Sequence, residues 1–505
     1  MEQRRTDVLV IGTGFGAAAP ALRLAEAGLH VTMLEKGPRF GPGDYRQTQD
    51  PKYLLRFLKG LSSDHLSLTY AEALGGGSGF YEMVSLRAPS LAFEQRDGHR
   101  RLWPAALTRA TLDPWYARAE AMLGVEQIPE EEVPPTGQVF SMLMQRMGLG
   151  CDRARYAVRN CRGSGFCVTG CIYGAKQSLH LNYLPQAVAS GAEIVCDAEA
   201  LEIVPLAGYD AASAEAPLRG SRYAVRCRMG GTGGQMVEYR AALVILGGGC
   251  VGTARLLLAS RPHLRYLSPH VGANIAFNGG VKLAVLLPED LPDADMYAGR
   301  SHPGVISYSL LPSHGATICT AKPLPLQMLA AGRLRRAGSD ARHEWWGRTH
   351  VELMRRVRHR MMVVASLGLT PPAGRLALDA DGTPRLSLDD KPRLAQHEHD
   401  IEALLRQRLE QAGCTMLEVD PVDRTGQVRE APWYTSAHQV GSCRMADSPM
   451  DGVTGVDGGV FNYPGLYVSD GAAVPSSLAV NTSLTILANA ERIADGIVQR
   501  LRRVA

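Results

Sequence analysis

Residues 6–36 contain the pattern that most restricts the fold: a strand, a glycine turn, a helix and a second strand. The run Asp7–Ile11 is short and apolar, which favours a strand buried on both faces. Residues 17–27 are rich in Ala and Leu and predict a helix, which Gly28 would cap at its C-terminal end. Val31–Leu34 is a second apolar run of strand type. This order predicts a βαβ-type opening and therefore an α/β fold.

The turn between the first strand and the helix, Gly12–Ala17, has the spacing of a dinucleotide-binding loop. Gly12 allows the tight turn, Gly14 allows the backbone to approach a pyrophosphate, and the small Ala17 allows close helix–strand packing. The helix N-terminus offers N–H groups and the positive end of a dipole to phosphates. Glu35 closes the second strand, where an acid can bind ribose hydroxyl groups and would repel a 2′-phosphate. The sequence therefore predicts a dinucleotide other than NADP, with FAD and NAD both open at this point.

The composition is that of an ordinary globular protein. The 505 residues suffice for two or three structural units, and 45% are hydrophobic and 21% charged. The net charge of +4 comes from scattered residues, and no Lys/Arg run is long enough to indicate nucleic-acid binding. The apolar run before Gly12 is too short for a secretory signal, and the longest one, 241–258, is broken by glycines and Arg255, so no membrane span is expected. We therefore expect a cytoplasmic protein whose ten cysteines are free, catalytic or metal-bound.

Beyond residue 36 the pattern changes several times. Residues 42–110 are rich in Gly and Pro and predict long loops over a cofactor, and residues 130–175 predict an irregular stretch that carries cysteines. Residues 193–246 alternate like hairpin strands, and the C-terminal part returns to glycine-rich turns before a final helix. We expect one α/β unit assembled from the start, middle and end of the chain. A second unit of mixed strands, with a basic helical insertion at 323–360, would lie between these parts.

Five segments resemble the glucose–methanol–choline (GMC) oxidoreductases, in particular their cholesterol-oxidase-like bacterial branch. They occur in the family's order along nearly the whole chain, and the two C-terminal segments are the most specific. The segments are Val10–Gly16, Leu74–Ser78, Gly247–Leu258, His438–Met445 and Leu466–Asn481.

The resemblance implies a fold in which a Rossmann-like FAD-binding domain is interleaved with an α+β substrate-binding domain. The FAD-binding domain would comprise residues 1–120, 151–278 and 430–505, and the substrate-binding domain residues 121–150 and 279–429. Tyr81 stands where many relatives carry Asn. The residues implied to contact FAD are Gly12, Gly14, Phe15, Gly16 and Glu35 at the dinucleotide loop, Gly76, Gly77 and Ser78 beside the flavin, Ala200 near the adenine, and Asp470, Gly471 and Ala472 along the ribityl chain and isoalloxazine.

His438 and Asn481 resemble the family's catalytic pair facing flavin N5, and their side chains suit alcohol oxidation. This reaction removes a hydroxyl proton and a carbon-bound hydride, and FAD accepts the hydride. Histidine is the natural base near neutral pH, and an Asn amide can hydrogen-bond the alcohol oxygen and hold the substrate in position. The residues themselves leave another interpretation open, in which His438 is a structural loop residue and Asn481 a helix N-cap.

Cys161, Cys167 and Cys171 form the most unusual motif, with the spacing C-x5-C-x3-C. A bacterial ferredoxin run has the spacing C-x2-C-x2-C-x3-C, and Ser164 occupies the second cysteine position here. Some GMC dehydrogenase subunits resemble this spacing and carry a three-iron iron–sulfur cluster, which implies a relay of electrons to an outside acceptor. Packing thiols, a disulfide and a zinc site are the other interpretations.

We therefore expect an FAD-dependent oxidoreductase that converts a small-molecule alcohol to an aldehyde or ketone, with oxygen or a redox partner as electron acceptor. Two other functions stay open: a GMC-fold lyase that uses the same histidine, and a flavin-bearing electron-transfer subunit of a larger dehydrogenase complex. The residue patterns do not distinguish among sterol, polyol, aromatic, sugar and aminoglycoside alcohols.

Overall fold

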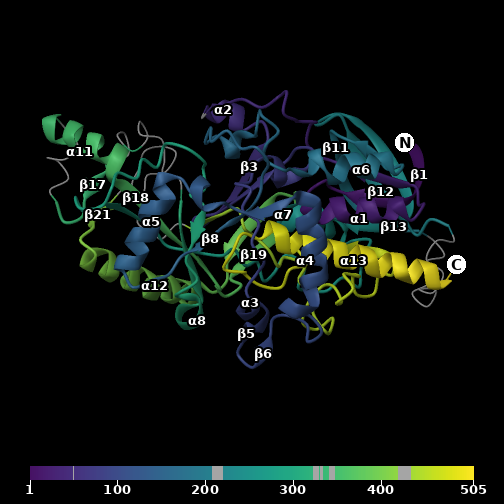
Figure 1. The fold of residues 1–505 in the computed structure, drawn as a ribbon. Coiled ribbons are helices and arrows are strands. Elements are labelled where there is room, and N and C mark those ends of the chain that lie inside the picture. The colour runs from purple at the N-terminus through teal and green to yellow at the C-terminus, as the bar shows by residue number, and fades with distance from the viewer. Residues whose placement is uncertain are drawn as a thin grey trace.

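The computed structural model describes residues 1–48, 50–206, 220–321, 329, 334–339, 347–418 and 434–504 (Figure 1). Two β-sheets organise this part of the chain. A seven-stranded sheet lies at the end of the molecule that holds the N-terminus and the end of the last helix, and a five-stranded sheet lies at the opposite end (Figure 1).

The seven-stranded sheet has the order β10-β2-β1-β13-β12-β11, and β23 pairs with the end of β13. Its central strands are parallel, as the βαβ-type opening predicts, and β12 and β11 continue the sheet as antiparallel hairpins. The strands are β1 (Glu2–Ile11), β2 (Val31–Leu34), β10 (Glu193–Val195), β11 (Ala198–Pro205), β12 (Tyr223–Met229), β13 (Gln235–Leu246) and β23 (Leu466–Val468). Strands from the start, middle and end of the chain therefore lie side by side, as expected.

Helices cover this sheet because its strands are apolar on both faces. α1 (Phe15–Glu26) packs against α13 (Ser483–Val504) and α6 (Tyr183–Ala189), and α7 (Gly249–Ser260) packs against β11. Glu491 of α13 is fully buried and receives a two-pronged ion pair from Arg23 of α1, at 2.7 and 2.8 Å. Tyr183 of α6 donates a third hydrogen bond to Glu491 (2.8 Å). One carboxylate therefore connects three helices.

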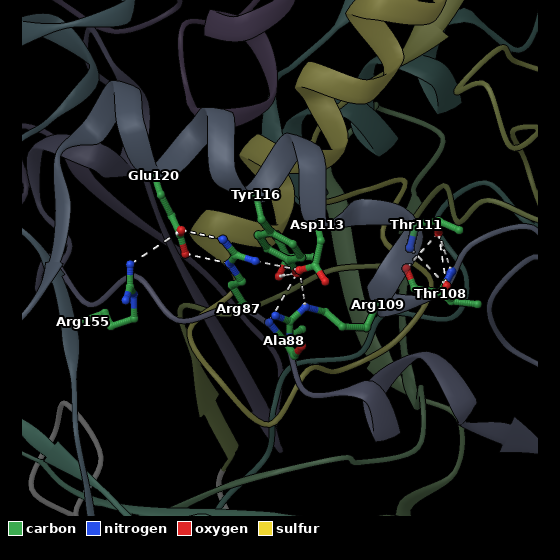
Figure 2. Close-up of polar contacts among 10 residues, drawn as sticks. Arg87, Ala88, Thr108, Arg109, Thr111, Asp113, Tyr116, Glu120 and Arg155 are labelled. Atoms are coloured by element: carbon green, nitrogen blue, oxygen red, sulfur yellow. Dashed lines mark hydrogen bonds and ion pairs between the residues drawn. The ribbon is translucent and has the colours of Figure 1, made fainter.

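α4 (Arg109–Leu123) packs across α13 and is fixed at both ends by polar contacts (Figure 2). Thr108 and Thr111 form a reciprocal capping box at its N-terminus. Arg87 lies beneath the helix and pairs with Asp113 and Glu120, each at 2.7 Å (Figure 2). The helix is thereby connected to the loop that precedes α3 (Ser90–Glu94).

The five-stranded sheet is antiparallel and has the order β16-β18-β14-β21-β17. Its strands are β14 (Lys282–Leu286), β16 (Ala316–Thr320), β17 (Arg335–Arg336), β18 (Met361–Gly368) and β21 (Thr415–Glu418). α11 (Gly347–Arg360) and α12 (Lys391–Gln411) pack against it. α11 is basic and belongs to the predicted insertion at 323–360, of which residues 323–328, 330–333 and 340–346 lie outside the described part. The predicted domain boundaries stay predictions.

The sequence expectation for residues 130–175 was wrong in part. Residues 130–175 were expected to be irregular, but α5 (Pro135–Arg146) is a three-turn helix with Pro at its first position. Val139, Phe140 and Leu143 bury its apolar face, so tertiary packing supplies the stability that local signals did not indicate.

The remaining elements are short. They are α2 (Pro51–Leu54), β3 (Leu58–Ser62), β4 (Leu66–Ala71), η1 (Gly76–Gly79), β5 (Arg96–Asp97), β6 (Arg100–Arg101), β7 (Val125–Gln127), η2 (Glu130–Glu132), β8 (Asp152–Arg153), β9 (Arg155–Ala157), η3 (Cys167–Thr169), η4 (Leu179–Leu181), β15 (Val305–Ile306), α8 (Leu311–His314), β19 (Gly374–Leu378), β20 (Pro384–Leu388) and β22 (Tyr434–Ser436).

Candidate active site

A cavity of about 1340 Å³ lies at the carboxyl ends of the parallel strands. The residues that line it include Gly12 after β1, Glu35 after β2, Gly247 after β13 and Asp470 just after β23. Open α/β sheets bind their ligands at this edge. The volume exceeds that of an ordinary small-ligand pocket, which is about 300–1,000 Å³, so the cavity is large enough for a dinucleotide cofactor.

The glycine turn forms one end of the cavity. Gly12 has φ +102°, and a Cβ at this position would lie 2.4 Å from the carbonyl oxygen of Gly247, so only glycine fits. Gly14 is the N-cap of α1 and no side chain caps the helix, which leaves first-turn N–H groups for an anion. A Cβ on Gly76 would lie 3.0 Å from the Cα of Gly14, so the two glycine loops form a narrow floor made of backbone.

Glu35 closes this end and is almost completely buried. Its Oε2 accepts a hydrogen bond from the Thr13 hydroxyl (2.5 Å), and its Oε1 accepts one from the Gly37 N–H (2.8 Å). Burial raises the pKa of the Glu35 carboxyl to about 7, although these two hydrogen bonds oppose the shift. The Glu35 carboxyl group therefore lines the cavity beside the glycine turn, and its contact with a ribose stays a prediction.

Most of the other predicted cofactor residues also line the cavity. The rings of Phe15 and Tyr81 meet edge to face, with centroids 5.4 Å apart. The remaining lining residues from the predicted set are Gly16, Gly76, Gly77, Ala200, Asp470 and Gly471.

Ser78 and Ala472 lie behind the cavity wall rather than in it. Ser78 is fully buried, donates to the carbonyl oxygen of Gly75 (2.7 Å) and accepts from the Leu179 N–H (3.1 Å). Ala472 is fully buried and donates its N–H to Oδ1 of Asp470 (2.8 Å). Both residues support the loops that form the wall, and their contact with a cofactor stays a prediction.

The carboxyl group of Asp470 accepts hydrogen bonds from α7 and from the turn after β23. Its Oδ2 accepts from the Gly249 N–H (2.7 Å) and from the Thr253 hydroxyl (2.6 Å), both at the start of α7. Burial raises the pKa of the Asp470 carboxyl to about 6. The residue therefore joins the turn after β23 to the N-terminus of α7 and lines the middle of the cavity.

His438 and Asn481 meet at the cavity wall although they lie 43 residues apart in the chain. Asn481 Nδ2 lies 3.2 Å from His438 Nε2. An amide nitrogen can only donate, so Nε2 accepts and the imidazole ring is neutral in this arrangement. Burial against protein atoms, aided by the nearby Lys282 ammonium, lowers the pKa of His438 to about 4. The sequence therefore identified two residues that the fold brings together.

The three cysteines of the unusual motif do not form a ligand set. All ten cysteines have free thiols. Within the described residues no group of three or more His, Cys, Asp or Glu side chains could hold a metal ion. Cys167 Sγ lies 3.9 Å from the sulfur of Met83, and Cys161 Sγ accepts from the Gly163 N–H. The interpretation of Cys161, Cys167 and Cys171 as iron–sulfur ligands is therefore not supported, and these thiols pack in a loop beside the cavity.

Sequence reasoning missed Lys176, which stabilises this cysteine loop. Its side chain is buried, and Nζ donates to the carbonyl oxygens of Gly79 (2.6 Å), Tyr81 (3.0 Å) and Cys167 (2.6 Å). Burial lowers the pKa of Lys176 to about 8. No local pattern marks the residue, because two of its three partners, Gly79 and Tyr81, lie 97 and 95 residues away in the chain.

Comparison with known proteins identifies the class. Two family models described as GMC oxidoreductase match residues 7–277 and 371–490. A long-chain-alcohol oxidase of Arabidopsis thaliana is 25% identical, over 99% of this chain and 68% of its own length. A cholesterol oxidase of Mycobacterium tuberculosis is 26% identical, over 97% of this chain and 90% of its own length.

Solved structures share the fold. A formate oxidase from Aspergillus oryzae RIB40 aligns with a TM-score of 0.66 at 14% identity, over 100% of both chains. An FAD-dependent oxidoreductase from Chaetomium thermophilum aligns with a TM-score of 0.67 at 16% identity, over 98% of this chain and 100% of the other.

The chain belongs to the GMC oxidoreductase family and is a flavoprotein oxidoreductase. The cavity fits FAD. It has a floor of glycine backbone, an uncapped helix N-terminus and a buried acidic side chain, which are the features of a dinucleotide-binding site. None of the helices in the described ranges combines the length and apolar character required to cross a membrane.

Proposed function

We propose that this protein oxidises an alcohol to an aldehyde or ketone, with His438 as the base and Asn481 as the residue that orients the substrate. One observation carries the proposal: a neutral imidazole and an amide meet at 3.2 Å on the wall of a cavity that begins at a dinucleotide loop. Bound FAD supplies the acceptor for the hydride that leaves the carbinol carbon.

His438 is suited to receive the hydroxyl proton. Its lowered pKa keeps Nε2 unprotonated at neutral pH, and the Nε2 lone pair becomes available when the Asn481 amide donates to the alcohol oxygen instead of to Nε2. An alcohol oxygen within reach of both side chains would transfer its proton to Nε2 and accept a hydrogen bond from Asn481 Nδ2. As the O–H bond breaks, its electron pair forms the carbonyl and the hydride departs from carbon. The low pKa then favours release of the proton from the imidazolium to solvent.

The local backbone restricts the histidine. The backbone N–H of His438 donates to the Ser436 hydroxyl (2.9 Å). This hydroxyl in turn donates to the carbonyl oxygen of Phe277 (2.7 Å). Such restriction favours catalysis because the base needs little reorganisation when the substrate binds.

The relatives support an apolar alcohol as the substrate. Two relatives are named for long-chain alcohols and for cholesterol, and we propose an alcohol of this kind for the present chain. Anaerobic mixing of the FAD-loaded protein with long-chain primary alcohols and with a sterol should bleach the flavin absorbance for at least one compound. Parallel assays under air and with an artificial acceptor would identify the oxidant.

Substitution of His438 tests its role as the base. His438→Ala should keep bound FAD and slow flavin reduction by about 10²–10⁴-fold. His99→Ala is a matched control, because His99 is exposed in the turn between β5 and β6. Flavin reduction in His438→Ala within about tenfold of the unaltered protein would exclude His438 as the base.

A further inference from the structure

A three-residue segment, 276–278, binds the chain next to both residues of the proposed catalytic pair. On one side it pairs with the strand-like segment before and after His438. Ala276 and Val440 exchange backbone hydrogen bonds at 2.9 and 2.8 Å, and the carbonyl oxygen of Phe277 accepts from Ser436 (2.7 Å). The position of His438 is therefore defined relative to this segment.

On the other side, the side chain of Asn278 holds the residues that precede Asn481. Its Oδ1 accepts from the N–H groups of Leu478 (2.7 Å) and Ala479 (3.1 Å), and its Nδ2 donates to the carbonyl oxygen of Val480 (2.7 Å). One buried amide therefore makes three hydrogen bonds to three consecutive residues. Asn481 follows directly.

The backbone that Asn278 holds is itself in an unfavourable conformation. Ala479 has φ +53°, a left-handed conformation that costs energy for a residue with a Cβ. Its N–H is bound by Asn278, and its carbonyl oxygen accepts from the Thr317 hydroxyl (2.5 Å). Without these contacts the segment would relax toward a commoner backbone conformation, and the Asn481 amide would move with it.

We propose that Asn278 is a positioning residue that sets the spacing between His438 and Asn481 by binding the backbone of residues 478–480. The inference rests on the proposed function, because it assigns Asn278 a role only through that pair. Asn278 contacts neither the cavity nor the reacting atoms, so its effect on the reaction passes through Asn481.

Asn278→Gly is the most informative variant. Asn278 has φ +47°, which glycine adopts without strain, so the change removes the side chain and leaves the backbone free to keep its conformation. Asn462→Gly is the matched control. Asn462 also has a left-handed φ (+68°) and donates its amide to a backbone carbonyl, that of Tyr266 (3.1 Å), in the loop before β23.

The expected result is a reduced rate of flavin reduction with an intact cofactor. In Asn278→Gly this rate should fall about 10- to 100-fold, the cost of a misplaced reacting group, while the FAD-to-protein ratio stays that of the unaltered protein. Hydrogen exchange measured by mass spectrometry should accelerate at Leu478 and Ala479, whose N–H groups lose their acceptor. Asn462→Gly should change neither quantity.

A double-variant cycle separates positioning from general stability. In an Asn481→Ala background, Asn278→Gly should cost less than about threefold in flavin reduction, because the residue that it positions is already absent. An equal cost in both backgrounds, or an unaltered rate in Asn278→Gly, would overturn the inference. A failure of the proposed function is seen separately, as unaltered flavin reduction in the single variants His438→Ala and Asn481→Ala.

Discussion

The hydroxyl of Thr13 donates a 2.5 Å hydrogen bond to Glu35 and accepts one of 2.8 Å from the N–H of Gly75. Thr13 belongs to the glycine turn, Glu35 to the end of β2, and Gly75 to the loop before η1. One buried hydroxyl therefore joins the three segments that form the dinucleotide end of the cavity.

Thr13→Val should weaken this end of the site while nearly conserving the side-chain volume. The Gly75 N–H would lose its acceptor, and a buried unpaired donor costs about 1–3 kcal/mol. We expect lower FAD affinity and a lower unfolding temperature, measured by fluorescence titration of apoprotein and by calorimetry. Thr13→Ser restores the hydroxyl and should restore both values; equal behaviour of the Val and Ser variants would contradict this role.

FAD affinity should decrease as the pH falls through 7. The pKa of Glu35 is raised to about 7, so the carboxyl is protonated below that pH and loses acceptor capacity for the ribose hydroxyl groups. The Kd of apoprotein for FAD should rise by up to about tenfold per pH unit below the pKa. Titrations at pH 8 and pH 6.5 would measure the change. Glu35→Gln should bind more weakly but without this dependence, and a dependence that persists in Glu35→Gln would assign it to another group.

Gly14→Val should fold but contain little FAD. A Cβ at Gly14 meets only the Cα of Gly76, at 3.9 Å, so the polypeptide accepts it, whereas the larger valine side chain would occupy space beside the phosphates. The flavin absorbance relative to the protein absorbance at 280 nm, together with circular dichroism, would test both parts. Gly43→Val serves as the control, because a Cβ at Gly43 meets nothing within 4 Å and Gly43 does not line the cavity. Full flavin content in folded Gly14→Val would argue against the assignment of this loop.

The acid limb of kcat/KM should lie well below pH 6.5. The pKa of His438 is lowered to about 4, and the base works in its neutral form, so activity is lost only as the pH falls toward that value. The second cause of the shift is Lys282. Lys282→Met should therefore move the limb to higher pH, and Lys391→Met, at the exposed start of α12, should leave it in place. An acid limb at the same pH in Lys282→Met would show that the Lys282 ammonium does not lower the pKa of His438.

Glu491→Gln should strongly destabilise the protein. The change leaves the guanidinium of Arg23 without its buried partner, and breaking a buried ion pair costs about 3–5 kcal/mol. Urea unfolding followed by tryptophan fluorescence would measure the loss. Glu26→Gln removes the exposed partner of the same arginine and should cost less than about 1 kcal/mol. Equal losses in the two variants would show that burial of Glu491 carries no special cost.

The sequence predicted the strands and the helix around the glycine turn well because their signals are local. The glycine turn and α1 follow β1, the second strand occupies the predicted range Val31–Leu34, and Glu35 comes directly after it. The meeting of His438 with Asn481 was also anticipated, from the family resemblance rather than from a pattern in the residues. The GMC family assignment is confirmed by the two family models.

Other features could not be predicted because they depend on distant contacts. Asn278 binds backbone groups about 200 residues away in the chain, and no periodicity marks such a residue. The long helix α12 was absent from the expected pattern of mixed strands. The cysteine spacing suggested an iron–sulfur cluster, yet sequence spacing alone does not make three thiols converge, and here they do not form a ligand group.

The arrangement of β1, β13 and β23 has a consequence for biosynthesis. During synthesis, β13 emerges more than two hundred residues after its neighbour β1, and β23 emerges more than two hundred residues after β13. The nascent chain must therefore keep apolar strand edges of β1 and β13 unpaired until these partners are synthesised, a state that chaperones commonly protect. The complete cavity exists only once β23 and Asn481 have been synthesised, so a cofactor can fill it only after these distant segments have folded together.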